Sequence, residues 1–303
     1  MKCRREPAGY HYYDRATGFH LLVDEVQPAP DEWALYPSTL SIALTNACQL
    51  ACPFCYAPKS RAELDARDVL SWALEAAELG ALDVAFGGGE PLLHPHLVEL
   101  CQRVWSETDL GISITTNGHA LSTELVDKLA GSVGFVRVSI DGPEPLYSRL
   151  RGRSLRELLW SLAALKDAIP FGINVVVWSL TLPGLDRLLE LAQEAGAKQM
   201  LLLPLIRDGG MALSVGEWEQ LGDWVRAHWR AFPLAISADA LGHVEAPLLF
   251  EHADPNSFAH ITAEGYLRRR SYGLHDGVAI RRYGSLKASL RSDEWRASGC
   301  TFE

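Results

Sequence analysis

The feature that most constrains the fold is a regular alternation, from Thr39 onward, of short apolar runs with longer amphipathic segments. Short β-branched or apolar runs predict strands, and alternation with amphipathic segments is typical of βαβ units around a parallel sheet. Six expected strands follow one another at residues 39–45, 82–86, 111–116, 135–140, 172–178 and 199–205. Because eight units close a complete barrel, six predict an α/β fold whose sheet curves into a partial (β/α)6 TIM-type barrel, open on one side.

The segments between these strands carry helix signals. Asp65 and Asp68 begin one expected helix, which ends at Gly80. Further helices are expected around Cys101 and at residues 122–129, 155–166 and 185–195. In folds of this kind polar residues at the carboxyl ends of the strands carry the chemistry, and we expect the site there.

Two flanks complete the predicted organisation. Residues 1–38 form an amino-terminal β-hairpin and linker, with a turn at Asp14 to Gly18, and residues 39–206 form the barrel. Residues 207–303 form an α+β extension with an aromatic helix around Trp224, two or three short strands and a final helix. The expected strand turns are Glu264-Gly265 and Asp276-Gly277.

Charge and hydropathy restrict the function classes. No run approaches the roughly 18 apolar residues of a membrane span, and the start MKCRREPAGYHYYD lacks the apolar core of a signal peptide. We therefore expect a cytoplasmic protein without a membrane partner. The formal net charge of -10 argues against a nucleic-acid partner.

Three of the six cysteines lie within eight positions, in the pattern Cys48-x-x-x-Cys52-x-x-Cys55. In a reducing compartment such a cluster indicates metal binding or catalysis and not disulfides. A zinc site needs a fourth ligand or water, and His94 or His96 could fold over from the next strand end. An iron-sulfur cube fits three thiols better, since its fourth iron stays open to another molecule.

The cysteine loop, with Phe54 and Tyr56 flanking its last thiol, resembles the signature of the radical S-adenosylmethionine (radical SAM) enzymes. FGGGEPLLHP resembles that family's GGEP motif, ITTNG resembles its third-strand motif, and VRVSIDGP is similar to its fourth strand. The resemblance implies a [4Fe-4S] cluster held by the three cysteines and contacts with S-adenosyl-L-methionine. The implied cofactor-binding residues are Phe54, Tyr56, Gly88, Gly89, Glu90, Pro91, Thr116, Asn117, Ser139, Asp141, Arg149 or Arg151, and Leu203.

The same resemblance implies reductive cleavage of S-adenosylmethionine to a 5′-deoxyadenosyl radical, which takes hydrogen from a substrate. Peptide-modifying relatives often carry a cysteine-rich extension called SPASM or twitch, and AHITAEGYLRRRSYGLHDGVAI looks like its hairpin. Ser271 stands where cysteine is usual, so we expect a degenerate extension without auxiliary iron. Cys300 is a candidate hydrogen donor, or an incidental terminal thiol.

The amino-terminal hairpin resembles that of peptide-modifying members of this family, and an open barrel suits an extended peptide along a strand edge, so we expect a ribosomal peptide that is crosslinked or epimerised. The alternative is a dehydrogenase or mutase that acts on a small-molecule natural-product intermediate. An alternative of another class is a non-catalytic, zinc-stabilised module that binds peptides. A small ferredoxin or flavodoxin is the expected electron donor for the enzyme.

Overall fold

A computed structural model describes residues 1–34, 36–207, 210–211, 213–244, 249–251, 257–272 and 277–298. Among these residues, no helix is long and apolar enough to cross a membrane. Cys300 and Asp276, which entered the sequence predictions, lie outside the described residues.

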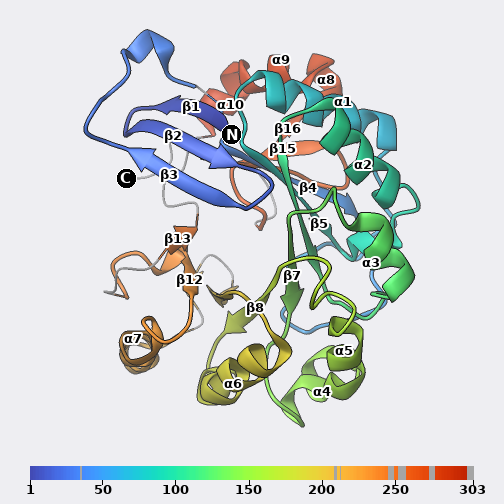
Figure 1. Cartoon of the computed structure of the whole chain (residues 1–303), viewed down its shortest axis with the longest axis vertical. Helices are drawn as coiled ribbons and strands as arrows, with labels where there is room; N and C mark the ends of the chain where they lie inside the picture. Colours follow the sequence, from blue (N-terminus) through green and yellow to red (C-terminus); the bar gives the residue numbers. More distant parts are fainter. Residues whose placement is uncertain are drawn as a thin grey trace.

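The centre of the fold is a curved sheet of eleven strands in the order β13-β12-β9-β8-β7-β6-β5-β4-β14-β15-β16 (Figure 1). All six predicted strands are present, and they lie parallel and in chain order. They are β4 (Thr39–Thr45), β5 (Asp83–Gly88), β6 (Gly111–Thr116), β7 (Phe135–Ser139), β8 (Phe171–Val177) and β9 (Met200–Pro204). The described strands do not close the sheet, because β13 and β16 stand at its two ends. The predicted open α/β barrel is therefore confirmed.

Helices cover the outer face of this sheet (Figure 1). They are α1 (Ala66–Glu78), α2 (Leu97–Glu107), α3 (Thr123–Leu129), α4 (Leu146–Arg151), α5 (Leu155–Leu162) and α6 (Leu185–Ala195). Local signals explain several ends: the Asp65 side chain accepts a hydrogen bond from the backbone nitrogen of Arg67, and Gly196 ends α6 in the left-handed conformation. Helix α4 was not predicted, and α5 is shorter than the predicted 155–166.

Strand alternation divides the side chains of the sheet between two faces. On β8, Ile173, Val175 and Val177 belong to the hydrophobic core shared with the helices. The alternate residues Asn174 and Val176 therefore lie on the opposite, concave face. On β4, β5 and β6 the residues that alternate with the core are small or polar, such as Ser41, Ala85 and Ser113, whereas on β9 they are Leu201 and Leu203.

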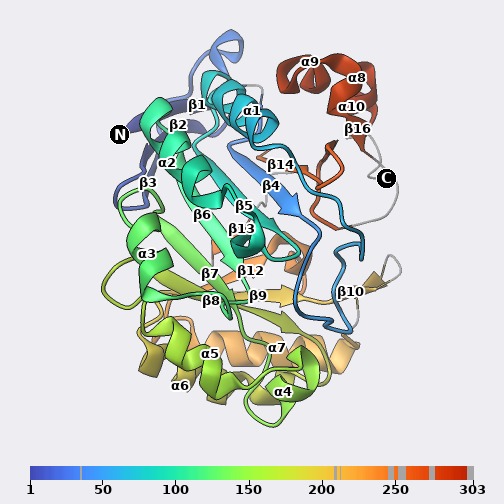
Figure 2. The ribbon, with the colours of Figure 1, turned by 90° about the vertical axis from the view of Figure 1, so that its right-hand side faces the viewer.

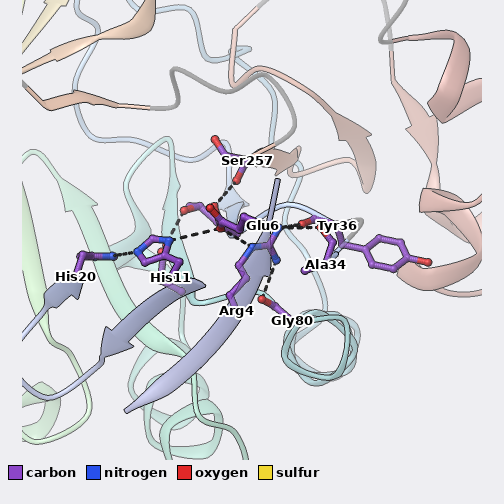
Figure 3. A network of polar contacts seen from close by, with 11 residues as sticks. Arg4, Glu6, His11, His20, Ala34, Tyr36, Gly80 and Ser257 are labelled. Atoms are coloured by element: carbon purple, nitrogen blue, oxygen red, sulfur yellow. Dashed lines mark hydrogen bonds and ion pairs between the residues drawn. The ribbon is translucent and has the colours of Figure 1, made fainter. Parts of the chain in front are cut away.

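The amino-terminal flank is a three-stranded antiparallel sheet of β1 (Lys2–Glu6), β2 (Gly9–Asp14) and β3 (Phe19–Val23). The predicted hairpin corresponds to β2 and β3; strand β1 was missed because its charged sequence KCRRE shows no apolar alternation. Arg4 fastens this sheet to the barrel (Figure 3). Its guanidinium donates to the carbonyl of Gly80 at 2.8 Å and to the carbonyl of Tyr36, and its Nε donates to Glu6 at 2.8 Å.

The carboxyl-terminal flank adds strands to both sides of the barrel sheet. Strand β12 (Leu234–Ser237) follows α7 (Val215–His228) and pairs with β9 in parallel, and β13 (Leu249–Glu251) extends that side. On the other side, β14 (Phe258–Ile261) pairs with β4, and β15 (Tyr266–Arg268) and β16 (Val278–Ala279) continue antiparallel. Apart from four single-turn 3-10 helices, the remaining described elements are two short strands, β10 (Ile206–Arg207) and β11 (Gly210–Met211), and three short helices, α8 (Ile280–Tyr283), α9 (Leu286–Leu290) and α10 (Asp293–Ala297).

Candidate functional site

The three clustered cysteines lie on the segment that leaves the carboxyl end of β4 (Figure 2). Cys48 and Cys52 are half-buried and Cys55 is exposed, and none of them is in a disulfide. A turn joins the last two, since the backbone nitrogen of Cys55 donates to the carbonyl of Cys52 at 3.1 Å. All three cysteines thus keep solvent-accessible surface.

Two glycines of the GGEP motif allow the end of β5 to lie against the start of the cysteine segment. A Cβ built on Gly88, whose φ is +126°, would stand 2.4 Å from the carbonyl oxygen of Thr45. A Cβ on Gly89 would stand 2.4 Å from the carbonyl oxygen of Ala47, next to Cys48. Two backbone hydrogen bonds also join these segments. The nitrogen of Gly89 donates to the carbonyl of Thr45 at 2.6 Å, and the nitrogen of Glu90 donates to the carbonyl of Ala47 at 2.9 Å. Only glycine permits this approach of two backbones.

Glu90 is fully buried at the carboxyl end of β5. Its Oε1 accepts hydrogen bonds from the hydroxyl of Thr116 at 2.6 Å and from the nitrogen of Leu92 at 3.1 Å, and its Oε2 accepts from the nitrogen of Asn117 at 2.8 Å. Burial raises the pKa of this carboxyl, although the hydrogen bonds oppose that shift. Pro91 follows it and is buried at the start of a 3-10 turn. Glu90 therefore joins the ends of β5 and β6.

Asn117 connects the end of β6 to the cysteine segment. Its Nδ2 lies 3.8 Å from Sγ of Cys48, and its Oδ1 accepts a hydrogen bond from Nε2 of Gln49 at 3.2 Å. The backbone nitrogen of His119 donates to the same Oδ1 at 3.1 Å. Gln49 was not predicted as a site residue because nothing in the local pattern distinguishes a loop glutamine.

A buried ion pair follows β7. Nε of Arg151 donates to Oδ2 of Asp141 at 2.6 Å, and Oδ1 of Asp141 accepts from the nitrogen of Val176 at 2.9 Å. Burial by itself would lower the pKa of Arg151, but the Asp141 carboxylate raises it. Arg149, the other arginine considered, is exposed on α4 and lies outside this pair. The structure thus brings Arg151, and not Arg149, beside Asp141.

The two aromatic residues of the cysteine segment lie in different surroundings. Phe54 is half-buried; its ring centroid lies 6.3 Å from that of Trp178, and the Arg151 guanidinium lies 5.4 Å from the Phe54 ring. Tyr56 is 59% exposed. Phe54 consequently connects the cysteine segment to the Asp141–Arg151 pair, whereas Tyr56 lies apart from that pair and its side chain is hydrogen-bonded to Ser271.

The concave face beneath these groups carries further side chains. Ser139 and Asn174 are neighbours in register on β7 and β8, and Val176 and Leu203 are neighbours on β8 and β9. Ser139, Val176 and Leu203 are half-buried. Asn174 is 7% exposed, and its Oδ1 has no hydrogen-bond partner among the described residues. The sequence did not single out Asn174, because an asparagine inside an apolar strand also fits a structural role.

The two histidines considered as zinc ligands have other contacts. A ring nitrogen of buried His94 lies 3.1 Å from the carbonyl of Leu64, and His96 pairs with Glu99 at 3.1 Å. Among the described residues, no three His, Cys, Asp or Glu side chains converge as they would around a single metal ion. Three thiols on one loop are nonetheless the ligand set that an iron-sulfur cube takes, and Gly88, Gly89 and Asn117 contact the residues at the start of that loop.

An open parallel barrel with a three-cysteine loop at the carboxyl ends of its strands defines a class of cofactor protein. The family model of the Radical SAM superfamily matches residues 42–195. The chain belongs to the radical SAM superfamily, whose members use a [4Fe-4S] cluster and S-adenosylmethionine.

Individual relatives agree with this membership. The PqqA peptide cyclase of Ruegeria pomeroyi is 34% identical over 185 residues, which are 57% of this chain and 48% of the relative. The AdoMet-dependent heme synthase of Methanosarcina barkeri is 28% identical over 220 residues, 68% of this chain and 63% of that protein. This chain thus spans about half the length of the peptide cyclases that it matches.

A solved structure, Streptococcus suis SuiB bound to precursor peptide SuiA, has the same fold. The TM-score is 0.76 at 14% identity, and the alignment covers 100% of this chain and 89% of that chain. The fold similarity therefore extends over both flanks as well as the barrel.

Proposed function

We propose that this protein is a radical SAM enzyme whose Cys48, Cys52 and Cys55 hold the cluster. The observation that carries the proposal is the close approach of the Gly88-Gly89 backbone to the start of the cysteine segment, which places Cys48 beside Asn117 and next to Ala47, the backbone partner of Glu90. When bound, the cluster and S-adenosylmethionine supply a 5′-deoxyadenosyl radical that abstracts hydrogen from a substrate.

The polar groups at the strand ends would bind and orient S-adenosylmethionine. Glu90 and the adjacent backbone suit its amino group, and buried Arg151, fixed by Asp141, suits its carboxylate. Ser139 suits the ribose hydroxyls, and the half-buried Val176 and Leu203 provide an apolar surface for adenine. Thr116 and Pro91 keep Glu90 in place, while Phe54 and Tyr56 flank the loop. Holding these groups in place before the reaction reduces the entropic cost of orienting the cofactor.

The substrate we propose is a ribosomal peptide, which the enzyme crosslinks or epimerises. Strand β3 supports this, since it pairs with β2 on one edge and carries Phe19, Leu21 and Leu22 at 53, 46 and 45% exposure. Within the described part of the chain, no strand pairs with its other edge. An extended peptide can add there as a further strand. The peptide named for the relatives and the peptide bound by SuiB are consistent with this proposal.

A second candidate is chemistry on a small molecule, favoured by the similarity to a heme synthase over 68% of this chain. Buried Asn174 on the concave face could bind an N–H or O–H donor of either kind of substrate. The proposal also includes a cytoplasmic location and a flavodoxin or ferredoxin as electron donor. It divides the chain after residues 38 and 206 into the amino-terminal flank, the barrel and the carboxyl-terminal extension. Cys300 stays a candidate hydrogen donor.

The test is an anaerobic assay. Protein reconstituted with iron and sulfide is reduced with dithionite and given S-adenosylmethionine, and 5′-deoxyadenosine is measured with and without peptides encoded beside the gene. We expect the nucleoside from the wild type and from Cys3→Ala, whose exposed thiol lies outside the loop, and none from Cys52→Ala. No nucleoside from fully reconstituted wild type, with every peptide tried, would refute the proposed chemistry. A mass change in one peptide would identify the substrate.

A further inference from the structure

The side chain of Asn117 points its amide nitrogen at a cluster thiol. Nδ2 of Asn117 lies 3.8 Å from Sγ of Cys48, within the range in which sulfur accepts a hydrogen bond. The backbone nitrogen of Leu50 lies 3.4 Å from the same sulfur. Among the three loop thiols in the described structure, Cys48 alone accepts such bonds.

The surroundings determine which end of the amide faces the sulfur. The oxygen and nitrogen of an asparagine are assigned from their hydrogen-bond partners. The backbone nitrogen of His119, 3.1 Å away, can only donate, and Nε2 of Gln49 donates from 3.2 Å. The His119 donor needs the amide oxygen, so the amide nitrogen faces Cys48, and Gln49 then presents Nε2 to that oxygen. The backbone nitrogen of Asn117 is itself bonded to Glu90, which fixes the main chain.

We propose that Asn117 raises the reduction potential of the cluster by donating a hydrogen bond to the Cys48 thiolate. This inference rests on the proposed function, because it requires the thiols to hold the cluster. An added electron increases the negative charge on the thiolates, and an N–H donor stabilises that charge more in the reduced state. Hydrogen bonds to the sulfurs are among the factors that set the potentials of iron-sulfur clusters. Asn117 is 5% exposed, so water screens the interaction little.

The experiment is a redox titration of the reconstituted holoprotein, followed by the electron paramagnetic resonance signal of the reduced cluster, without S-adenosylmethionine or substrate. Asn117→Leu removes the donor. Asn117→Asp keeps the acceptor oxygen for Gln49 and His119 but replaces the amide N–H group with oxygen. Gln49→Leu is the control, since it removes a loop contact and leaves the donor in place. Iron and sulfide per chain are measured for every variant.

We expect Asn117→Leu to lower the ratio of reduced to oxidised cluster about tenfold at a fixed potential, which equals about 59 mV for one electron. Asn117→Asp should lower it further, because a carboxylate adds negative charge beside the thiolate. Gln49→Leu should change the ratio less than about twofold, since it leaves the N–H donor to Cys48 in place.

Two results would overturn the inference. One is an unchanged potential in Asn117 variants that hold a full cluster. The other is loss of the cluster from both Asn117 variants while Gln49→Leu keeps it, which would show that Asn117 shapes the loop instead. Either result is separate from failure of the proposed function, in which the wild type itself would hold no cluster or form no 5′-deoxyadenosine.

Discussion

Asp141 and Arg151 form a buried ion pair, joined by a 2.6 Å hydrogen bond from Nε of the arginine to Oδ2 of the aspartate. Asp141 is fully buried, and Arg151 is 9% exposed. The pair connects the end of β7 with α4, and the contact from Val176 to Asp141 adds the end of β8. Three elements of the barrel, β7, α4 and β8, are thereby joined around one carboxylate.

Removing the arginine should therefore destabilise the protein. Arg151→Met leaves Asp141 as a buried charge without its partner, and such a loss costs about 3–5 kcal/mol of unfolding free energy. Urea denaturation measures this change. Arg149→Met is the matched control, because Arg149 lies exposed on the same helix and should change the stability by less than about 0.5 kcal/mol. Equal effects of the two substitutions would refute the structural role of the pair.

Replacement of Gly89 by alanine should disturb the cysteine loop. The new Cβ would meet the carbonyl oxygens of Ala47 and Asn46 at 2.4 and 2.6 Å, so the backbone beside Cys48 must move. We expect reconstituted Gly89→Ala to hold less than about half of the wild-type iron. The contacted atoms belong to the backbone, which cannot move aside as the end of a flexible side chain can. Gly87→Ala, two positions earlier on β5, is the control, since a Cβ there has no atom within 4 Å. Normal iron content in Gly89→Ala would contradict the prediction.

The sequence predicted the barrel well because its signals are local. Each barrel strand is a short apolar run, and the predicted helices have amphipathic periodicity, with capping residues such as Asp65 and Gly196 at some of their ends. The pairing of β14 with β4 could not be predicted from such local signals. Phe258–Ile261 is only four residues long, and its partner Thr39–Ile42 lies more than two hundred positions away. No local pattern specifies such a partner.

The sequence predicted the identity of several site residues but not the contacts between them. Motif spacing indicated Glu90 and Asn117 as site residues, but their hydrogen bonds with each other and with the cysteine loop emerge only in three dimensions. The choice between Arg149 and Arg151 likewise depended on burial, because the two residues are two positions apart on one short helix and point to different environments. Spacing cannot decide which of them is inside.

Glu90→Gln should change both stability and its dependence on pH. The buried carboxyl accepts three hydrogen bonds, and an amide would set its NH2 group against one of those donors, at a cost of about 1–3 kcal/mol. The raised pKa of Glu90 means that its contribution to stability is complete below the unfolded value of about 4.3 and is lost as the pH rises through the folded value. The stability advantage of the wild type over Glu90→Gln should therefore shrink as the pH rises from 4. A constant difference across this range would contradict the raised pKa.

His260, on the concave side of β14, should make the protein sensitive to mild acid. A ring nitrogen lies 3.0 Å from Oγ of Ser41, and burial, aided by Arg268, lowers the pKa of His260 to about 4. The unfolded chain takes up a proton near pH 6.5 while the folded chain does not, so stability present above that pH is lost as the pH falls toward 4.

The lost stability should amount to about 3 kcal/mol, because each unit of pKa difference is worth 1.36 kcal/mol. Urea denaturation of the wild type and His260→Asn between pH 7 and pH 4.5 measures the effect, and the variant should lose less stability over that interval. His96→Asn is the comparison for an exposed histidine and should follow the wild-type curve within about 0.5 kcal/mol. If the wild type and His260→Asn kept a constant difference down to pH 4.5, the acid sensitivity would have to arise from other groups.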